Sequence, residues 1–171
     1  PYGGGIRAVE HHSESREAYW AHTPGLKVVI PSGPRNARAL LAASIRDDDP
    51  IVFYEPKAVY RAFREEVPDE PETMEIGKAE VVREGKDLTL ISYGAMMRPC
   101  KEAVSDLADD HGIDVELIDL LRISPMDTET LAASVQTTGR CVIVNEGQRT
   151  CCVAAEIMAR LNEVAFEYLE A

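Results

Sequence analysis

The sequence lacks the features that mark several large classes of protein. It contains no apolar run long enough to cross a bilayer, and it does not open with the charged and apolar regions of a secretory signal. Neither a G-x-G-x-x-G fingerprint nor a P-loop occurs in it. We therefore expect a cytoplasmic protein without a membrane partner, and no nucleotide site in its second half.

Positive charge is also scarce. The 30 acidic residues outnumber the 18 basic ones, which gives a net charge of −12, and only five of the basic residues are lysines. Because such a surface repels phosphates, we expect no nucleic-acid partner. Heavy acidity with little lysine suggests a surface suited to high salt, although an ordinary acidic cytosolic protein fits the same composition.

The four cysteines show neither the spacing of zinc ligands nor the framework of a small disulfide-rich domain. Cys141 lies in an apolar stretch and is predicted to pack in the core. Cys151 and Cys152 are neighbours, and a disulfide between them would be strained, so we expect free thiols. The cysteines therefore give no indication of redox catalysis.

A polar cluster, EHHSES at residues 10–15, is the most informative stretch of the chain. Its side chains are costly to bury without partners, so it is either a solvated loop or a functional surface. Imidazole and carboxylate groups could bind zinc or iron, and His12 beside Ser13 could be a base and a nucleophile. No H-E-x-x-H, C-x-x-C or G-x-S-x-G motif supports these hypotheses. From the residues alone, a hydrogen-bonded loop is favoured.

The first half of the chain alternates predicted helices and strands. Helices are predicted at 16–21 and 36–45, the second with Ser32 as its cap. Apolar runs at 26–30 and 51–54 predict buried strands. A strand, a helix and a strand at this spacing indicate a parallel α/β unit.

Residues 60–77 are rich in proline and acidic residues, which predicts a linker, with an acidic docking surface as the less favoured alternative. The predicted elements that follow are strands at 88–93, 115–118 and 141–144, and helices at 97–111, 127–138 and 150–169. This alternation predicts an α/β fold with an open, mostly parallel sheet and helices on both of its faces.

Several ordered motifs resemble one enzyme family. HSES, HTPGLKVVIP, a helix that ends in IRDDDP before a buried strand, and EPK resemble the beta subunit of thiamine-diphosphate-dependent 2-oxoacid dehydrogenases of the pyruvate and branched-chain type. EIGKAEVVREGKDLTLISYGAMM, VELIDLLRISPMD and SVQTTGRCVIVNEGQRT resemble the second domain of that subunit. The resemblance covers essentially the whole chain, in order.

The resemblance implies two domains. Residues 1–75 would be the C-terminal part of a transketolase-like pyrimidine-binding domain with its linker, and residues 76–171 a transketolase C-terminal-like domain without its last strand. The chain would be an internal fragment, inactive alone, that lacks the glutamate which activates the aminopyrimidine ring. Cysteines replace two glycines usual in the family's TGGFGAE motif, here at 150–156, and Asn145 stands where histidine is usual.

The implied reaction is oxidative decarboxylation of a 2-oxoacid with acyl transfer to lipoamide. His12 would be the catalytic histidine beside the thiamine, with Ser13 orienting it, and His11 is a weaker candidate. Thiamine diphosphate would be shared with an alpha subunit, which would also hold Mg²⁺. The implied partners are this alpha subunit, in a heterotetramer, other beta subunits, and the dihydrolipoyl acyltransferase core.

The turn after the second predicted helix matches a structural potassium site of the family. The matching positions are Ser44, Ile45, Asp47 and Asp49, and a plain acidic turn is the alternative.

Three other interpretations of the function of the whole chain remain open. They are acetoin dehydrogenase, a transketolase or deoxyxylulose-phosphate synthase relative, and a non-catalytic assembly or docking module.

Overall fold

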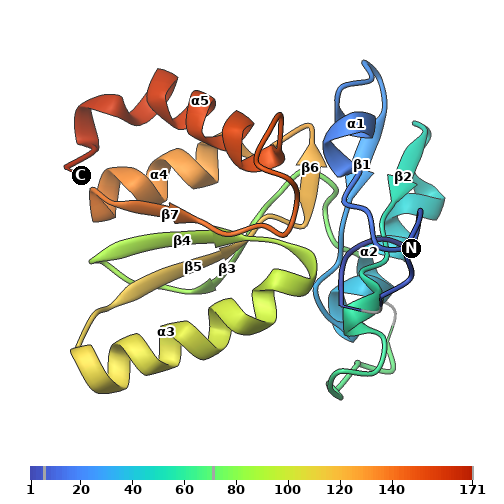
Figure 1. Ribbon diagram of the computed structural model, residues 1–171, viewed down its shortest axis with the longest axis horizontal. Coiled ribbons are helices and arrows are strands. Elements are labelled where there is room, and N and C mark those ends of the chain that lie inside the picture. Colours follow the sequence, from blue (N-terminus) through green and yellow to red (C-terminus); the bar gives the residue numbers. More distant parts are fainter. Residues whose placement is uncertain (6, 71, 171) are drawn as a thin grey trace.

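The computed structural model describes residues 1–5, 7–70 and 72–170. In it the chain forms two β-sheets that lie side by side, each with its own helices (Figure 1). Among the described residues no helix is long and apolar enough to cross a membrane. The N terminus lies with the smaller sheet, and the C terminus lies at the far end of the larger one (Figure 1).

The larger sheet belongs to the second half of the chain. Its strand order is β3-β5-β4-β7, with β4 parallel to both of its neighbours and β3 antiparallel at one edge. The strands are β3 (Glu80–Arg83), β4 (Leu88–Ser92), β5 (Val115–Asp119) and β7 (Cys141–Ile143). This is the open, mostly parallel sheet that the alternating pattern predicts.

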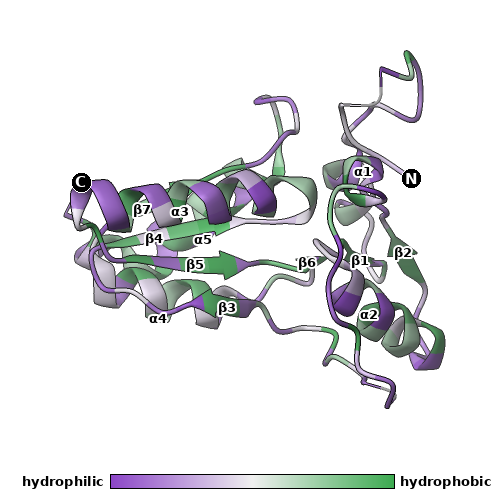
Figure 2. Ribbon diagram, turned by 90° about the horizontal axis from the view of Figure 1, so that it is seen from below, coloured by the Kyte–Doolittle hydropathy of each residue, from purple (hydrophilic) through white to green (hydrophobic). Residues whose placement is uncertain are grey.

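Helices cover both faces of this sheet (Figure 1). Helix α3 (Met97–His111) lies on one face, and α4 (Thr128–Thr138) and α5 (Val153–Ala165) lie on the other. Because side chains alternate along a strand, Leu90 packs towards α3 whereas Ile91 packs towards α4 and α5. Strands β4 and β5 are accordingly among the most hydrophobic segments of the ribbon (Figure 2).

The smaller sheet has the order β2-β1-β6. Strands β1 (Lys27–Val29) and β2 (Ile51–Phe53) are parallel and are joined through α2 (Pro34–Arg46), as the parallel unit predicts. Helix α1 (Glu17–Ala21) precedes β1. Three short 3₁₀ turns complete the fold, at Lys57–Val59, Gly94–Met96 and Phe166–Tyr168.

Strand β6 (Arg122–Ser124) joins the two halves, because it comes from the second half of the chain and pairs antiparallel with β1. The chain leaves β5 at Asp119 and enters the other sheet three residues later. Residue Leu121 turns the backbone there with a φ of 52°. A three-residue strand leaves no periodic pattern, so the sequence did not predict β6, and it did not predict β3 either.

The helix ends show where local rules held and where they failed. Asp127 caps α4 as predicted, since its carboxylate accepts the Thr130 N–H. The prediction of Ser32 as the N-cap of α2 is wrong, because the N-cap residue is Gly33. The backbone N–H groups of Ser32 and Gly33 both donate to Asn36 Oδ1. The final helix begins at Val153 instead of residue 150, because residues 150–152 form the turn before it.

The segment at 60–77 contains no helix or strand among its described residues. The segment contacts the N-terminal part of α2. The Arg35 guanidinium pairs with Glu72 at 2.8 Å, and the backbone N–H of Arg35 donates to the Glu65 carboxylate at 2.9 Å. Arg38 donates to the carbonyls of Pro68 and Asp69. Two arginines of one helix therefore neutralise and hold part of the acidic segment.

Candidate active site

Residues 3–5 and 7–14, here called the His12 loop, project from the body of the protein next to the N terminus (Figure 2). The Gly3 N–H donates to the Glu14 carbonyl at 3.2 Å and so closes the two ends of the loop. Near its tip the His12 N–H donates to the Glu10 carbonyl at 2.5 Å, across a left-handed His11 with a φ of 57°. This turn leaves the His12 side chain exposed.

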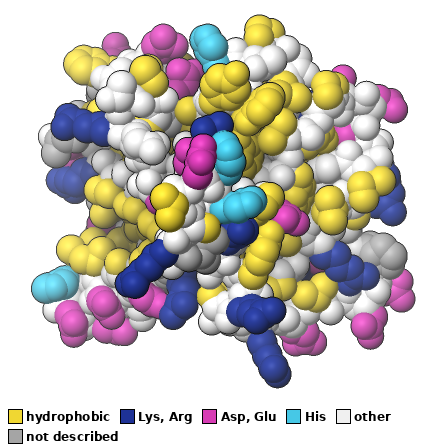
Figure 3. Space-filling model, turned by 45° about the vertical axis from the view of Figure 1, so that its right-hand side comes forward, with side chains coloured by type: hydrophobic (Ala, Val, Ile, Leu, Met, Phe, Trp, Pro, Cys, Tyr) yellow, Lys and Arg dark blue, Asp and Glu magenta, His cyan; other side chains and the backbone are white. Residues whose placement is uncertain are grey.

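The His12 imidazole has no hydrogen bond or ion pair within the described part of the chain. Its neighbour His11 lies 3.5 Å from a Glu10 carboxylate oxygen. The Ser13 hydroxyl is buried and has no hydrogen-bond partner there either, so no contact links it to His12. Figure 3 looks towards this half and shows histidines at the surface among hydrophobic and acidic side chains. The His12 imidazole is thus open to solvent.

Helix α1 anchors the C-terminal end of the loop through a buried carboxyl group. Glu17 is only 2% exposed, and the Tyr93 hydroxyl donates to its Oε1 at 2.8 Å. Its other oxygen, Oε2, is buried without a hydrogen-bond partner among the described residues. Burial raises the pKa of Glu17 above its ordinary value of 4.5.

A second acid, Glu146, lies at the N-terminal end of the loop. A β-carbon on Gly3 would overlap its Oε1, and the nearby backbone N–H of Gly4 acts to lower the pKa of its carboxyl group. That oxygen is buried and has no partner in the described residues. Burial, together with the charge of Glu17, raises the pKa of Glu146. The two carboxyl groups are therefore electrostatic neighbours.

Two tyrosines fill the space around these acids. Tyr2 is 1% exposed, its ring meets Tyr54 edge-to-face at 5.1 Å, and its hydroxyl has no partner among the described residues. Burial raises the pKa of Tyr2 and Tyr93, and the negative charge of Glu17 adds to both effects. Burial also raises the pKa of Tyr54 to about 12. The phenols therefore stay protonated and can donate.

This cluster lies at the carboxyl edge of the larger sheet, where open α/β sheets usually bind their ligands. Tyr93 follows β4, Glu146 follows β7, and Asp119 ends β5. Asp119 is fully buried, and burial raises its pKa to about 7. It accepts hydrogen bonds from the Ser32 hydroxyl and, at 3.3 Å, from the Leu121 N–H. The two halves of the chain thus meet through polar contacts at this edge.

A cavity of about 670 Å³ opens between α1 and the turn after β7. Its lining includes Ser15, Glu17, His22, Gln148, Cys151 and Cys152. All four cysteines are free thiols, as predicted for Cys151 and Cys152, and Cys141 packs against the core as predicted. His12 is not among the lining residues, so the loop tip and this cavity are separate features.

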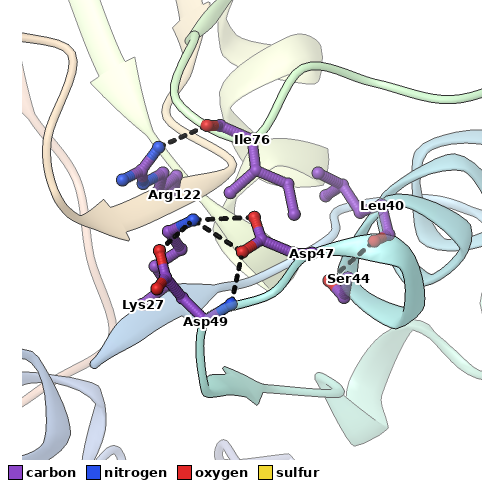
Figure 4. Close-up of polar contacts among 7 residues, drawn as sticks. All are labelled: Lys27, Leu40, Ser44, Asp47, Asp49, Ile76 and Arg122. Atoms are coloured by element: carbon purple, nitrogen blue, oxygen red, sulfur yellow. Dashed lines mark hydrogen bonds and ion pairs between the residues drawn. The ribbon is translucent and has the colours of Figure 1, made fainter. Parts of the chain in front are cut away.

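The predicted potassium positions lie at the C-terminal end of α2 and in the turn after it, and Lys27 lies between two of them, Asp47 and Asp49 (Figure 4). Lys27 Nζ is 2.7 Å from Asp47 and 2.8 Å from Asp49. These contacts raise the pKa of Lys27 and lower that of Asp47. The side chains of Asp47 and Asp49 therefore face an internal cation, whereas the ligands expected for potassium are largely the backbone carbonyls of this turn.

The other two predicted positions contribute no free side-chain ligand. The Ser44 hydroxyl donates to the Leu40 carbonyl at 2.7 Å, and the Ile45 side chain is 76% exposed. Only backbone carbonyls of this turn could serve an added ion. Elsewhere in the described chain, no three His, Cys, Asp or Glu side chains converge as a metal site.

Sequence reasoning placed His12 at the surface loop but missed the acids beneath it. Glu17 and Glu146 are single acidic residues in otherwise unremarkable stretches, and Tyr2 and Tyr93 each stand before glycine. Their proximity comes from long-range contacts, since Tyr93 and Glu17 are 76 positions apart. No local pattern in the sequence predicts that these acids and tyrosines lie together.

Comparison with known protein families accounts for most of the chain. Residues 1–62 match the pyrimidine binding domain of transketolase, and residues 77–171 match the transketolase C-terminal domain. Among solved structures, the chain is similar to a split gene transketolase described as an inactive beta4 tetramer. The TM-score is 0.76 at 25% identity, and the match covers 89% of this chain and 49% of the other.

Curated relatives match along the full chain. Beta subunits of the pyruvate dehydrogenase E1 component are 48% identical in Bacillus subtilis (strain 168), 49% in Staphylococcus aureus (strain N315) and 50% in Acholeplasma laidlawii. Each match covers all 171 residues of this chain and 52% of the relative. The chain thus spans about half the length of the curated relatives it matches.

Proposed function

This chain belongs to the transketolase family, and we propose that it forms part of the beta subunit of a thiamine-diphosphate-dependent 2-oxoacid dehydrogenase. The observation that carries the proposal is the 48–50% identity, along the whole chain, to beta subunits of the pyruvate dehydrogenase E1 component. The ordered motifs around His12 and in the second domain support the same assignment.

In this proposal thiamine diphosphate, when bound, supplies the electron sink for decarboxylation. The chain contributes the His12 imidazole, which orients the substrate carboxylate or donates a proton during acyl transfer to lipoamide. The exposure of His12 on a projecting loop supports contact with a cofactor held largely by another subunit. We assign the diphosphate and its Mg²⁺ to an alpha subunit.

The remaining assignments are part of the same proposal. Pyruvate is the first substrate to test because the relatives are pyruvate dehydrogenase subunits, with branched-chain 2-oxoacids next. The partners are an alpha subunit in a heterotetramer, further beta subunits and the dihydrolipoyl acyltransferase core, all in the cytoplasm. The half-length chain alone is expected to be inactive. A structural potassium ion would have to bind beside the Lys27 pair.

The test uses the full-length beta subunit assembled with its alpha subunit. His12→Ala is expected to lower pyruvate-dependent acylation of a lipoylated acceptor by about a hundredfold or more, because proton transfer or substrate orientation is lost. His111→Ala is the matched control, since that imidazole is exposed at the end of α3. Unchanged turnover of His12→Ala would remove the catalytic role.

A panel of pyruvate, branched-chain 2-oxoacids and acetoin, assayed with the same complex, separates the substrate alternatives. An assembled complex that binds the acyltransferase core but turns over none of them would favour the non-catalytic assembly module instead.

A further inference from the structure

Two adjacent cysteines, Cys151 and Cys152, lie in the chain between β7 and α5, at the end of the larger sheet that faces α1 (Figure 1). Because a trans peptide places neighbouring Cα atoms about 3.8 Å apart, the two thiols stay within reach of each other. Both are free thiols, Cys151 is exposed, and Cys152 is half-buried. The backbone therefore holds a dithiol at the surface.

Neither thiol contributes to the fold in an evident way. Cys152 is the N-cap residue of α5, but its side chain makes no capping hydrogen bond. Cys151 has a φ of 55°, in the left-handed region that costs a residue with a β-carbon roughly 1–2 kcal/mol. Its exposed side chain recovers little of that cost by packing. The pair is therefore free to react.

Both thiols also face open space. They line the cavity of about 670 Å³ between α1 and this turn, and a second cavity of about 490 Å³ beside β6. The larger cavity is also lined by Glu17, whose buried Oε2 has no hydrogen-bond partner in the described part of the chain. An unpaired acceptor in a space of this size favours the entry of small molecules that carry O–H groups. Water and hydrogen peroxide are such molecules.

We propose that Cys151 and Cys152 are a reversible oxidation site, which hydrogen peroxide converts to a disulfide between the two neighbours. The exposed sulfur of Cys151 attacks a peroxide oxygen, the O–O bond breaks, and a sulfenic acid and one water form. The sulfur of Cys152 then attacks the sulfenic sulfur, so that the S–S bond forms, the S–O bond breaks and a second water leaves. The two sulfurs are oxidised, the peroxide is reduced, and both thiol protons end in the waters.

The bond between neighbours is easy to reduce again. Disulfides usually join Cα atoms at least about 4.4 Å apart, whereas neighbours in a trans peptide are about 3.8 Å apart. Closing the bond therefore strains the turn, and strained or exposed disulfides are the labile ones. The site acts as a switch, in contrast to a structural cross-link.

The turn that would be strained packs against α1. A β-carbon on Gly147 would lie 3.4 Å from Glu17 Oε1 and 3.7 Å from Ser15 Cβ. Val153, directly after the pair, is 3% exposed and belongs to the core cluster against which α1 also packs. Because α1 follows the His12 loop, oxidation should disturb the placement of His12. This consequence rests on the proposed function, whereas the chemistry of the dithiol does not.

Thiol labelling of the full-length chain, alone and assembled with its alpha subunit, tests the site. The protein is treated with hydrogen peroxide and then with N-ethylmaleimide, and trypsin releases residues 150–160 for mass spectrometry. Without peroxide this peptide should carry two labels. With peroxide it should carry none and weigh less by two hydrogen atoms. Dithiothreitol before labelling should restore both labels.

The same digest contains its own controls. Met158, 57% exposed on the same peptide, gains an oxygen when peroxide reaches it and should do so only after the labels are lost. Cys100 is 4% exposed, has no neighbouring thiol, and should stay a thiol. Two labels that persist after Met158 is oxidised would overturn the proposal. A disulfide to a second chain, seen on a non-reducing gel, would also overturn it.

Two variants separate the roles of the thiols. In Cys152→Ser the reaction should stop at the sulfenic acid of Cys151, which dimedone traps. In Cys151→Ser the half-buried thiol of Cys152 should keep its label at peroxide doses that remove both labels from the unsubstituted chain. Equal loss of label in all three proteins would mean that the two thiols do not act together.

The failures of the site and of the proposed function can be told apart. If the disulfide forms but the untreated complex does not turn over pyruvate, the function is wrong and the site stands. If the complex is active and both labels persist, the site is wrong and the function stands. If both hold, peroxide should lower turnover, dithiothreitol should restore it, and Cys151→Ser should resist the loss. Unchanged turnover of the oxidised enzyme would remove the consequence for His12.

Discussion

Two acidic clusters in this protein are neutralised in opposite ways. At the end of α2, Asp47 and Asp49 flank the Lys27 ammonium at 2.7 and 2.8 Å. At the base of the His12 loop, Glu17 is buried and Glu146 is half-buried, and desolvation raises the pKa of both carboxyl groups. One cluster is a network of ion pairs around a lysine, and the other is a pair of acids whose pKa is raised by desolvation.

The difference follows from burial. A partly exposed carboxylate gains from a nearby ammonium at little desolvation cost, so the pKa of Asp47 is lowered. A buried carboxylate without a cation is cheaper to protonate than to ionise, so the pKa of Glu17 is raised. Acidic residues in a sequence therefore do not reveal their charge state until their neighbours are known.

Among these predictions, the largest expected effect is the pH dependence of stability that comes from the buried carboxyl group of Asp119. Its pKa is raised from 3.8 to about 7, so its favourable contribution is fully present below pH 3.8 and is lost as the pH rises through about 7. The free energy of unfolding of the full-length chain should fall by up to about 4 kcal/mol over this window. Asp119→Asn should flatten the dependence, because the amide cannot ionise.

Urea unfolding at about pH 4 and about pH 8 measures this difference. Asp106→Asn, an exposed substitution on α3, is the control and should leave the pH dependence unchanged. If Asp119→Asn shows the same pH dependence as the unsubstituted chain, Asp119 is not the group that titrates.

Gly3→Ala should produce the next largest effect, because it adds backbone strain and crowds the carboxyl group of Glu146. Gly3 has a φ of 92°, and its new β-carbon would overlap Glu146 Oε1. We expect a loss of about 3 kcal/mol from strain and overlap together. Gly112→Ala is the matched control: its φ is 65°, but nothing lies within 4 Å of the new β-carbon. It should cost only about 1 kcal/mol.

Thermal unfolding of the full-length chain compares the two glycine variants. Equal losses would mean that Glu146 yields freely and does not hold the loop base in place. A larger loss in Gly3→Ala would show that the carboxyl group is fixed.

The same contrast shows how far the sequence could be interpreted. Periodicity and turn residues identified α3, α4 and the parallel strands, because each of these elements carries its own local signal. The short strand β6 could not be predicted, since it owes its existence to pairing with β1. The misplaced cap at Ser32 has a similar cause, because its hydroxyl is drawn to Asp119, 87 positions away.

In the candidate site, too, the residues that carry a local sequence signal could be predicted, and those brought together by long-range contacts could not. The loop that carries His12 could be predicted because six consecutive polar residues cannot be buried cheaply. The acids below it could not, because Glu17 becomes buried only when Tyr93 packs against α1. At the predicted potassium turn, the ordered motif gave no sign that Lys27 would face both Asp47 and Asp49, because that contact joins residues 20 or more positions apart.

Lys27→Met should have a smaller effect on stability than Asp119→Asn or Gly3→Ala, and its effect should depend on salt. Removing the ammonium leaves Asp47 and Asp49 to repel each other, so thermal stability should fall slightly at neutral pH. Because the lowered pKa of Asp47 contributes its full stabilisation above the ordinary value of 3.8 and loses it as the pH falls through the lowered value, the difference between the two proteins should vanish below that range. Salt at about 1 M should also shrink it, since screening weakens exposed pairs.

Thermal unfolding of the unsubstituted chain and Lys27→Met, each with and without salt, measures both effects. A surface adapted to high salt adds a further expectation, namely that the unsubstituted chain becomes more stable in molar salt although its Lys27 pairs weaken. A melting temperature that does not rise with salt would reject that adaptation. Added potassium that stabilises Lys27→Met more than sodium does would instead reveal a cation site that the lysine normally fills.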